Sequence, residues 1–209
     1  MATQHKAVTR RTQAERRQET QAAILTAALQ SLVEEGYAGF SAIGVAARAG
    51  VSRGAQEHYY PKKIDLVTAA TAHALDEAIA HARATSSTIG SPETAIDEFL
   101  AESEAFFFAP AFTALMEIVI VARSDKALAK IVYPVLASSR RELDRIWLDA
   151  LVHAGYARAD AEQFIELSQY LLRGIFFVNT WLPYHVQRTA TLEAWRKLAP
   201  LVLRPSRPA

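Results

Sequence analysis

The stretch that decides the fold is Ser41-Ala-Ile-Gly-Val-Ala-Ala-Arg-Ala-Gly-Val-Ser-Arg-Gly-Ala-Gln-Glu-His-Tyr-Tyr-Pro-Lys-Lys63. It predicts two short helices joined by a tight turn. Ser41 and Ser52 are the expected N-caps, because a serine hydroxyl accepts a hydrogen bond from a free amide of the first turn. Gly50 ends the first helix, because glycine adopts the left-handed conformation without steric cost. Pro61 ends the second helix near Tyr60. This order is the helix-turn-helix plan.

The outer face of the second helix separates two interpretations, a plain helical hairpin in an all-α core and a DNA reader. Its side chains are ones that donate to phosphates and base edges, which favours the DNA reader. Gly54 is a poor helix former that lets a partner approach the backbone closely. The candidate base readers are Arg53, Gln56 and His58; the candidate phosphate ligands are Ser41, Tyr59 and Lys63; and Ser52, Gly54, Ala55 and Lys62 complete the expected DNA-binding face.

A longer pattern surrounds this stretch. It consists of Ile24-Leu25, Ala27-Ala28, Gly36-Tyr37, Phe40-Ser41, Val45-Ala46, Ala49-Gly50-Val51-Ser52, Gly54, Tyr59-Tyr60-Pro61, Lys63 and Leu66. In order and spacing it resembles the DNA-binding domain of the TetR family of transcriptional regulators. The resemblance covers about the first third of the chain. It implies an all-α protein, with a three-helix DNA-binding domain followed by a helical ligand-binding and dimerisation domain, expected at residues 1–63 and 64–209.

The chain departs from the family pattern at three positions. Glu57 stands where many members have tyrosine or another uncharged residue, and we expect it to pair with Arg53 four residues earlier on the helix. Ile43 and Gly44 stand where many members have polar or charged residues. Base recognition is therefore expected to rest on the second helix more than on the first.

Composition excludes several classes of protein. Of 209 residues, 51% are apolar and 22% are charged, which is typical of a globular chain. The absence of cysteine excludes disulfides and thiolate metal sites. Because the N-terminus is polar and no apolar run reaches eighteen residues, we expect a cytoplasmic protein with no membrane partner.

Positive charge is concentrated in the predicted DNA-binding domain. Residues 1–63 hold nine Lys/Arg and five Asp/Glu, whereas the remainder holds fourteen and seventeen. Binding to a phosphate backbone requires such an excess, although one this small can also arise by chance. Residues 1–15 carry Lys6, Arg10 and Arg11, and form either an arm on the DNA or a solvated tail.

Helical periodicity continues along the whole chain, and no strand pattern occurs. Caps, glycines and prolines place the helices at about 16–35, 62–85, 92–108, 110–123, 126–153, 160–181 and 187–203, with a disordered tail at 204–209. The helix at 62–85 joins the two expected domains, so it is the natural lever between them.

The second domain is rich in aromatic residues, which form either a plain core or the lining of a small-molecule cavity. Family resemblance favours the cavity. Its candidate lining residues are His73, Phe107, Met116, Glu117, Ile120, Tyr133, Trp147, Phe176 and Asn179. Phe177, Trp181, Trp195 and Leu198, near the chain's end, are the candidate dimer interface, because a large apolar patch often marks a partner surface.

Enzyme and metal functions receive little support. No glycine-rich phosphate loop, zinc-protease motif or nucleophile elbow is present, so no cofactor is expected. His73, Glu77 and His81 are spaced four apart, but such spacing is more typical of a solvated helix face than of a metal site. We therefore predict a homodimeric, ligand-responsive regulator, a repressor released from double-stranded operator DNA by a small molecule. The alternative is a helical small-molecule-binding protein or enzyme with an accidental helix-turn-helix likeness.

Overall fold

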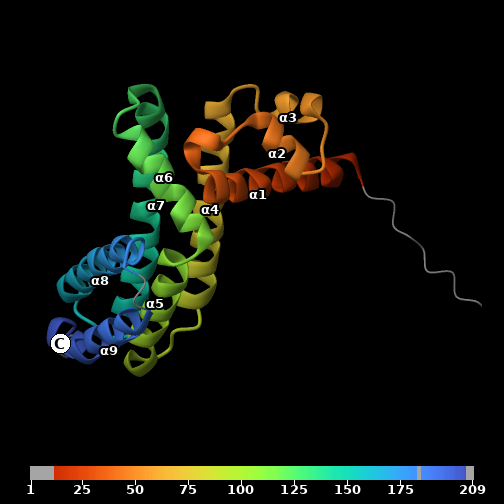
Figure 1. Ribbon diagram of the computed structural model, residues 1–209. Helices are drawn as coiled ribbons and strands as arrows, with labels where there is room; N and C mark the ends of the chain where they lie inside the picture. The colour runs from red at the N-terminus through yellow and green to blue at the C-terminus, as the bar shows by residue number, and fades with distance from the viewer. Residues whose placement is uncertain (1–11, 183–184, 206–209) are drawn as a thin grey trace, which may run out of the picture. The chain divides into compact units, whose positions relative to one another are not determined.

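The computed structural model describes residues 12–182 and 185–205, apart from the side chains of Glu93, His185 and Val186, and within these ranges all extended secondary-structure elements are helices (Figure 1). The helices are α1 (Gln13–Gly39), α2 (Ala42–Arg48), α3 (Arg53–Tyr59), α4 (Lys63–Ser86), α5 (Pro92–Phe107), α6 (Pro110–Ala122), α7 (Lys126–His153), α8 (Arg158–Asn179) and α9 (His185–Val202). The predicted all-α class is confirmed. The predicted basic arm, with Lys6, Arg10 and Arg11, and residues 206–209 of the predicted tail lie outside the described residues.

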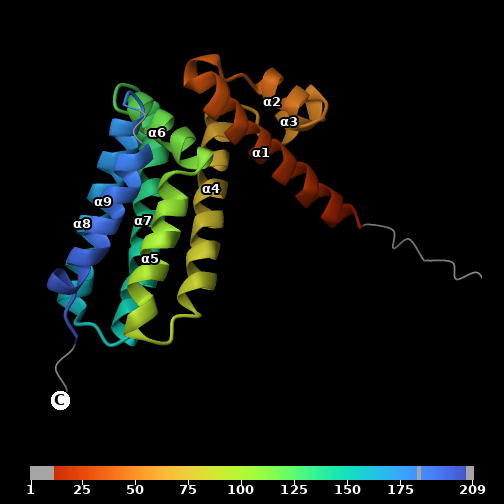
Figure 2. The same ribbon diagram turned by 60° about the horizontal axis from the view of Figure 1, so that its bottom comes forward.

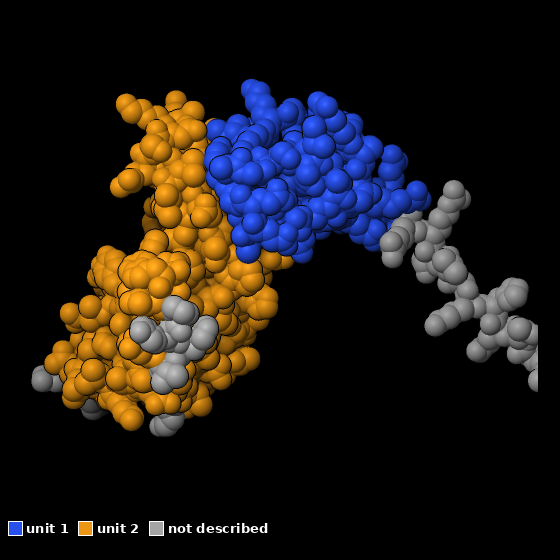
Figure 3. Space-filling model, viewed as in Figure 1, with its two compact units in different colours: residues 1–70 blue, residues 71–209 orange. Residues whose placement is uncertain are grey.

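The chain divides into two compact units, Met1–Ala70 and Thr71–Ala209 (Figure 3). The division falls inside α4, after Ala70, so this helix begins in unit 1 and ends in unit 2.

Unit 1 is built around α1. Thr12 and Glu15 form a reciprocal capping box at its start, which satisfies amides that have no partner inside the helix. Gly36 leaves helical geometry at φ 64°, as expected of a glycine stop, but one further turn follows to Gly39. Fully buried apolar side chains on α1, α2 and α4, among them Ile24 and Val45, form the core of the unit.

The helix-turn-helix forms as the local sequence predicts. The Ser41 Oγ accepts from the Gly44 amide at 3.1 Å, and the Ser52 Oγ accepts from the Ala55 amide at 3.1 Å. Gly50 between them has φ 67°, the left-handed conformation that favours glycine. Both predicted N-caps and the predicted turn are confirmed, and together they fix where α3 begins.

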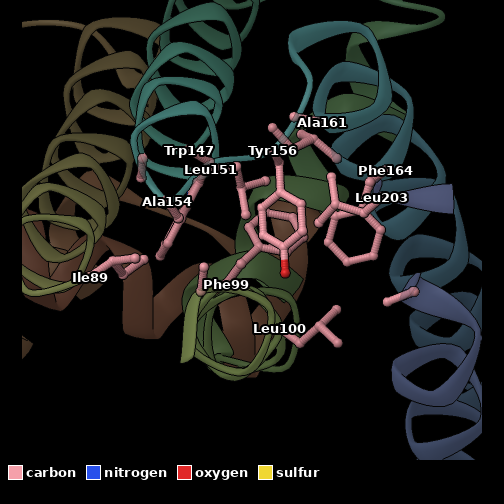
Figure 4. Packing of buried hydrophobic residues seen from close by; sticks show 14 of the residues in the cluster. Ile89, Phe99, Leu100, Trp147, Leu151, Ala154, Tyr156, Ala161, Phe164 and Leu203 are labelled. Carbon is pink, nitrogen blue, oxygen red and sulfur yellow. The ribbon is translucent and has the colours of Figure 1, made fainter. Parts of the chain in front are cut away.

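Unit 2 is a helical bundle in which α5, α7, α8 and α9 lie side by side (Figures 1 and 2). The Phe99 ring lies at the centre of its core, with centroids 5.3 Å from Trp147 and 5.4 Å from Phe164 (Figure 4). Tyr156 is buried beside them and donates from its hydroxyl to the Pro92 carbonyl at 3.0 Å. This contact joins the start of α5 to the loop between α7 and α8.

Within the described residues, no single helix has the length and apolar character needed to cross a membrane. One bent pair, Thr94–Phe107 with Pro110–Ala122, meets the criterion by length and composition, with an angle of 62° between its halves.

Candidate nucleic-acid interface and ligand cavity

The exposed face of α3 carries Ser52, Arg53, Gly54 and His58, and Lys62 is exposed just beyond the helix. The Arg53 Nε lies 2.6 Å from the Glu57 Oε1, so the expected pairing is confirmed. Glu57 thus offsets the charge of Arg53 on this face. Any external acceptor must compete with that carboxylate for the guanidinium donors.

Gln56 does not belong to this face, and its prediction as a base reader is wrong. It is completely buried, and its Nε2 donates to the Tyr60 carbonyl at 2.8 Å. Its side chain therefore caps the carboxyl end of α3 from inside the unit.

Lys63 also binds other groups of the protein. Its Nζ donates to the Tyr37 carbonyl at 2.8 Å and to the Phe40 carbonyl at 2.9 Å. The same ammonium lies 4.3 Å from the centre of the Tyr37 ring, and burial lowers the pKa of Lys63. The phosphate role predicted for Lys63 needs correction, because two of its three donors hold the end of α1. Lys62 is the exposed cation beside it.

Gly44 and Gly54 differ in the space around the position where a Cβ would lie. A Cβ on Gly44 would lie 3.0 Å from the Ser41 Oγ, so this position stays small to preserve the cap of α2. A Cβ on Gly54 would meet no atom within 4 Å. The protein's own packing therefore does not require Gly54, and its surface stays open to a close external partner. Ile43, at 61% exposure, places an apolar side chain on the outside of α2.

Two cations of unit 1, Arg17 and Arg48, were not among the predicted residues. The Arg17 guanidinium lies 5.8 Å from the centre of the Tyr59 ring, so α1 contributes charge next to α3. Arg48 pairs with Glu34 at 2.6 Å and Glu35 at 3.2 Å, which fastens α2 to α1. For Arg17, the usable signal is an exposed arginine on the helix that precedes the helix-turn-helix.

Unit 2 contains a cavity of about 490 Å³, within the usual size range of small-molecule sites. A hollow of about 50 Å³ adjoins it. The cavity is lined by Leu75, Phe106, Phe112, Leu115, Met116, Val119, Tyr133, Leu136, Ala137, Arg140, Leu143, Arg173 and Phe177. The hollow shares Phe106, Arg140, Leu143 and Arg173 with the cavity and adds Ala78, Ala82, Phe99, Glu102, Ser103, Phe107, Trp147 and Gln169.

The structure brings four of the predicted ligand residues to these spaces. Met116 and Tyr133 line the cavity, and Phe107 and Trp147 line the hollow. Phe176 lies behind the wall, with its ring 4.8 Å from that of Phe112.

Four other predicted ligand residues lie elsewhere. Ile120 is 53% exposed on the outer side of α6, so its prediction is wrong. Glu117 and Asn179 are half-buried and contribute to neither lining. The His73 Nε2 lies 3.5 Å from the Glu77 Oε1, and no group of three metal-ligating side chains occurs in the part of the chain that the structure describes.

Several polar lining residues were not predicted. Arg140 and Arg173 line both the cavity and the hollow, and Glu102, Ser103 and Gln169 line the hollow alone. Arg173 is a single charge in the otherwise apolar run 171–178, and an isolated charge of that kind is a signal worth following. Arg140 gives no comparable signal, because it stands in a charged stretch of α7.

The candidate dimer residues separate into two groups. Trp181 is 64% exposed, Leu198 is 49% exposed and Phe177 is 38% exposed, as a partner surface requires. Trp195 instead packs inside the unit: its ring stacks on Phe164 at 5.7 Å, and its Nε1 donates to the Ser168 Oγ at 2.8 Å. The assignment of Trp195 to the interface needs correction for this reason.

Comparisons with known proteins agree with the fold. The family model for bacterial regulatory proteins of the tetR family matches residues 24–70. The HTH-type transcriptional regulator CymR of Pseudomonas putida is 33% identical over 192 residues, which cover 90% of this chain and 95% of that protein.

Solved structures show the same architecture at low identity. A TetR-family structure from Mesorhizobium loti has a TM-score of 0.73 at 11% identity, covering 90% of this chain and 98% of that one. A TetR regulator from Haloarcula marismortui has a TM-score of 0.67 at 20% identity, covering 90% and 100%. The multidrug binding protein EbrR, complexed with imidazole, has a TM-score of 0.57 at 22% identity, covering 93% and 97%. The chain belongs to the TetR family of bacterial regulatory proteins and is a DNA-binding transcriptional regulator, not an enzyme whose helix-turn-helix likeness is accidental.

Proposed function

We propose that this regulator is a homodimeric repressor that places α3 in the major groove of its operator and leaves the DNA when a small molecule binds in unit 2. The observation that carries the proposal is the exposed face of α3, where Arg53 and His58 flank the open backbone at Gly54. Arg53 and His58 are the proposed base readers. Ser41, Tyr59 and Lys62 are the proposed phosphate ligands, with Ser52, Gly54 and Ala55 at the closest approach of backbone to DNA.

The proposed division of labour follows the chain. Residues 1–63 would bind DNA, and residues 64–209 would bind the ligand and the second protomer. One recognition helix reads only a few base pairs, so a two-fold dimer that reads two half-sites supplies the missing specificity. The exposed apolar side chains at the end of α8 and on α9 support a dimer surface there.

Helix α4 supports the proposed route of release. Near its start, Lys63 holds the last turn of α1, and further along, Leu75 and Ala78 line the two spaces of unit 2. A ligand that binds more tightly when α4 is in one position than in another shifts the equilibrium between these two positions. The size of the shift is set by the difference between its two affinities. By reciprocity, bound DNA weakens that ligand to the same degree. The likeness to EbrR, described as a multidrug binding protein, is consistent with a small-molecule site.

Fluorescence anisotropy with labelled DNA from the region beside the gene tests the proposal. The wild-type protein should bind one segment much more tightly than mixed-sequence DNA, with an affinity that falls steeply as salt rises. Arg53→Ala should cost about 1–3 kcal/mol on that segment and relax selectivity at one base position. Equal selectivity at every position in this variant would remove Arg53 from the base readers, and affinity unaffected by salt would contradict DNA recognition.

A further inference from the structure

The cavity of unit 2 has an apolar wall with a single charged patch. Arg140 on α7 and Arg173 on α8 are the only charged side chains among its described lining residues, and both also line the adjoining hollow. Aromatic and aliphatic side chains from α4, α5, α6, α7 and α8 form the rest of the wall. A ligand that fills this space therefore meets apolar surface on most sides and two guanidinium groups at one place.

The two arginines are not equally paired. The Arg140 Nε lies 2.6 Å from the Asp144 Oδ2, while the other oxygen of that carboxylate accepts from the Gln169 Nε2 at 2.6 Å. Each oxygen of the Asp144 carboxylate thus accepts one hydrogen bond, from Arg140 and from Gln169, and neither bond involves Arg173.

Arg173 has only weak neutral partners. Its Nη1 reaches the backbone carbonyl and the side-chain oxygen of Gln169 at 3.4 and 3.5 Å, and its guanidinium lies 5.0 Å from the centre of the Phe107 ring. Within the described residues, no carboxylate forms an ion pair with it. Burial, with a further contribution from the charge of Arg140, lowers the pKa of Arg173 to about 10 and outweighs the charge of the nearby Asp144, which raises it, so Arg173 still carries its charge at neutral pH.

A charged group on an apolar wall is unfavourable unless a counter-ion reaches it, because the wall replaces the water that would otherwise solvate it. The smaller hollow contains one more carboxylate, Glu102, which accepts from the Thr85 Oγ1 at 3.3 Å rather than from Arg173. The guanidinium geometry matches a carboxylate, which can accept two parallel hydrogen bonds from it.

We propose that the effector is an apolar monocarboxylate, whose carboxylate is bound by Arg173 beside Arg140 and whose apolar body lies against Phe112, Tyr133 and Phe177. This inference rests on the proposed function, because it names the chemical class of the small molecule. One organic anion balances the charge of Arg173, which, of the two arginines that line the cavity, is the one without a carboxylate ion pair among the described residues. The aromatic rings around it offer edges and faces to an aryl or alkyl body.

Isothermal titration calorimetry on the full-length protein without DNA tests the inference. The probes are 4-phenylbutanoate and octanoate, each compared with its primary amide, which keeps the shape and removes the charge. At least one acid should bind about tenfold or more tightly than its amide, which is the usual effect of charge-assisted hydrogen bonds. Tighter binding of either acid would support the proposal. It would also show whether the apolar part of the effector is aryl or alkyl. Equal binding of acid and amide would overturn the proposal. So would no binding of either acid at a concentration of about 10 mM, since a specific site should bind more tightly than that.

Variants assign the charge to its residue. Arg173→Gln should lose the preference for acid over amide, and Arg173→Lys should keep part of it. Arg141→Gln, an exposed neighbour outside the cavity lining, should behave as wild type. An unchanged preference in a folded Arg173→Gln protein, with folding checked by circular dichroism, would overturn the assignment. If that variant does not fold, Arg173→Lys and the acid-to-amide comparison in the wild type decide the question.

A parallel measurement separates this inference from the proposed function. Release of operator DNA by a neutral compound, equal in wild type and Arg173→Gln, would overturn the carboxylate but leave the ligand-released repressor intact. A protein that binds no DNA but prefers acids over amides would have the opposite meaning. It would contradict the proposed repressor function and leave the proposed carboxylate site intact.

Discussion

At the scale of single residues, Lys62 and Lys63 show how neighbours of identical chemistry acquire different roles. Lys62 is exposed, whereas the Lys63 ammonium is held by two carbonyls at the end of α1. Cations near the carboxyl end of a helix also interact favourably with its dipole. Lys63 therefore stabilises the helix-turn-helix from within, and Lys62 remains available for an external anion.

Substitution of each lysine should separate stability from DNA binding. Lys63→Met keeps the alkyl chain but removes both hydrogen bonds, so the free energy of unfolding should fall by about 1–3 kcal/mol. Lys62→Ala should leave that free energy nearly unchanged and lower the salt dependence of DNA binding by about one unit of slope. Urea denaturation and anisotropy titrations measure the two effects. The opposite pattern, with Lys62 governing stability, would refute both assignments.

Gly54 offers a second residue-scale prediction. Gly54→Ala introduces a methyl group into open space and replaces a poor helix former with a good one, so thermal stability should stay equal or rise, by up to about 1 kcal/mol. Operator affinity should nevertheless fall, because the added Cβ occupies the place where we propose that DNA approaches the backbone. Anisotropy and calorimetric melting test this together. Operator affinity equal to that of wild type would show that nothing approaches α3 closely at this position.

At the scale of elements, α4 and α7 are joined by a charged cluster on the bundle of unit 2. Glu142 on α7 accepts from Arg145 at 2.8 Å and from Arg83 of α4 at 2.5 Å. Arg145, and then Arg83, lower the pKa of Glu142 from 4.5 to about 2. The cluster therefore holds the later part of α4, which is the helix that we propose to move on ligand binding.

This pKa shift gives the cluster a defined pH dependence. Because the pKa is lower in the folded state, its contribution to stability is complete above pH 4.5 and is lost as pH falls towards 2. Glu142→Gln should therefore be less stable than wild type at pH 6, and the difference should shrink progressively below pH 4.5. Denaturant titrations at several pH values measure this, with Glu98→Gln, an exposed carboxylate on α5, as the control. A difference that stayed constant down to pH 2 would argue against the cluster.

Helix ends were the most predictable elements, because caps and stops act over only a few residues. Ser41 and Ser52 both accept from amides of the helices that follow them, and Gly50 adopts a positive φ at the predicted stop. The direction in which a side chain points was less predictable, because it depends on neighbours that are distant in sequence. Gln56 turned inward, and Arg173 entered the cavity wall, for reasons of packing that no local pattern contains.

At the scale of the whole molecule, the apolar side chains left exposed near the end of α8 and on α9 support assembly. Trp181→Glu should yield monomers in sedimentation while the protomer stays folded, because this side chain is 64% exposed. Trp195→Glu should instead unfold the protomer, since it breaks the stacking on Phe164 and the hydrogen bond to Ser168. Loss of the dimer in Trp195→Glu with an intact melting transition would move Trp195 back to the interface, and a dimer that survived Trp181→Glu would place the interface elsewhere.

The Arg53–Glu57 pair has a consequence for how such a regulator finds its target in a genome. A repressor spends most of its time on the wrong DNA, held by phosphates that carry no information. A carboxylate 2.6 Å from the guanidinium competes with each of those phosphates and repels them. Complexes with non-specific DNA therefore become short-lived. The correct base, which offers two acceptors to one guanidinium, still displaces the carboxylate. If α3 reads DNA as proposed, Glu57 gives up some affinity everywhere and thereby shortens the search.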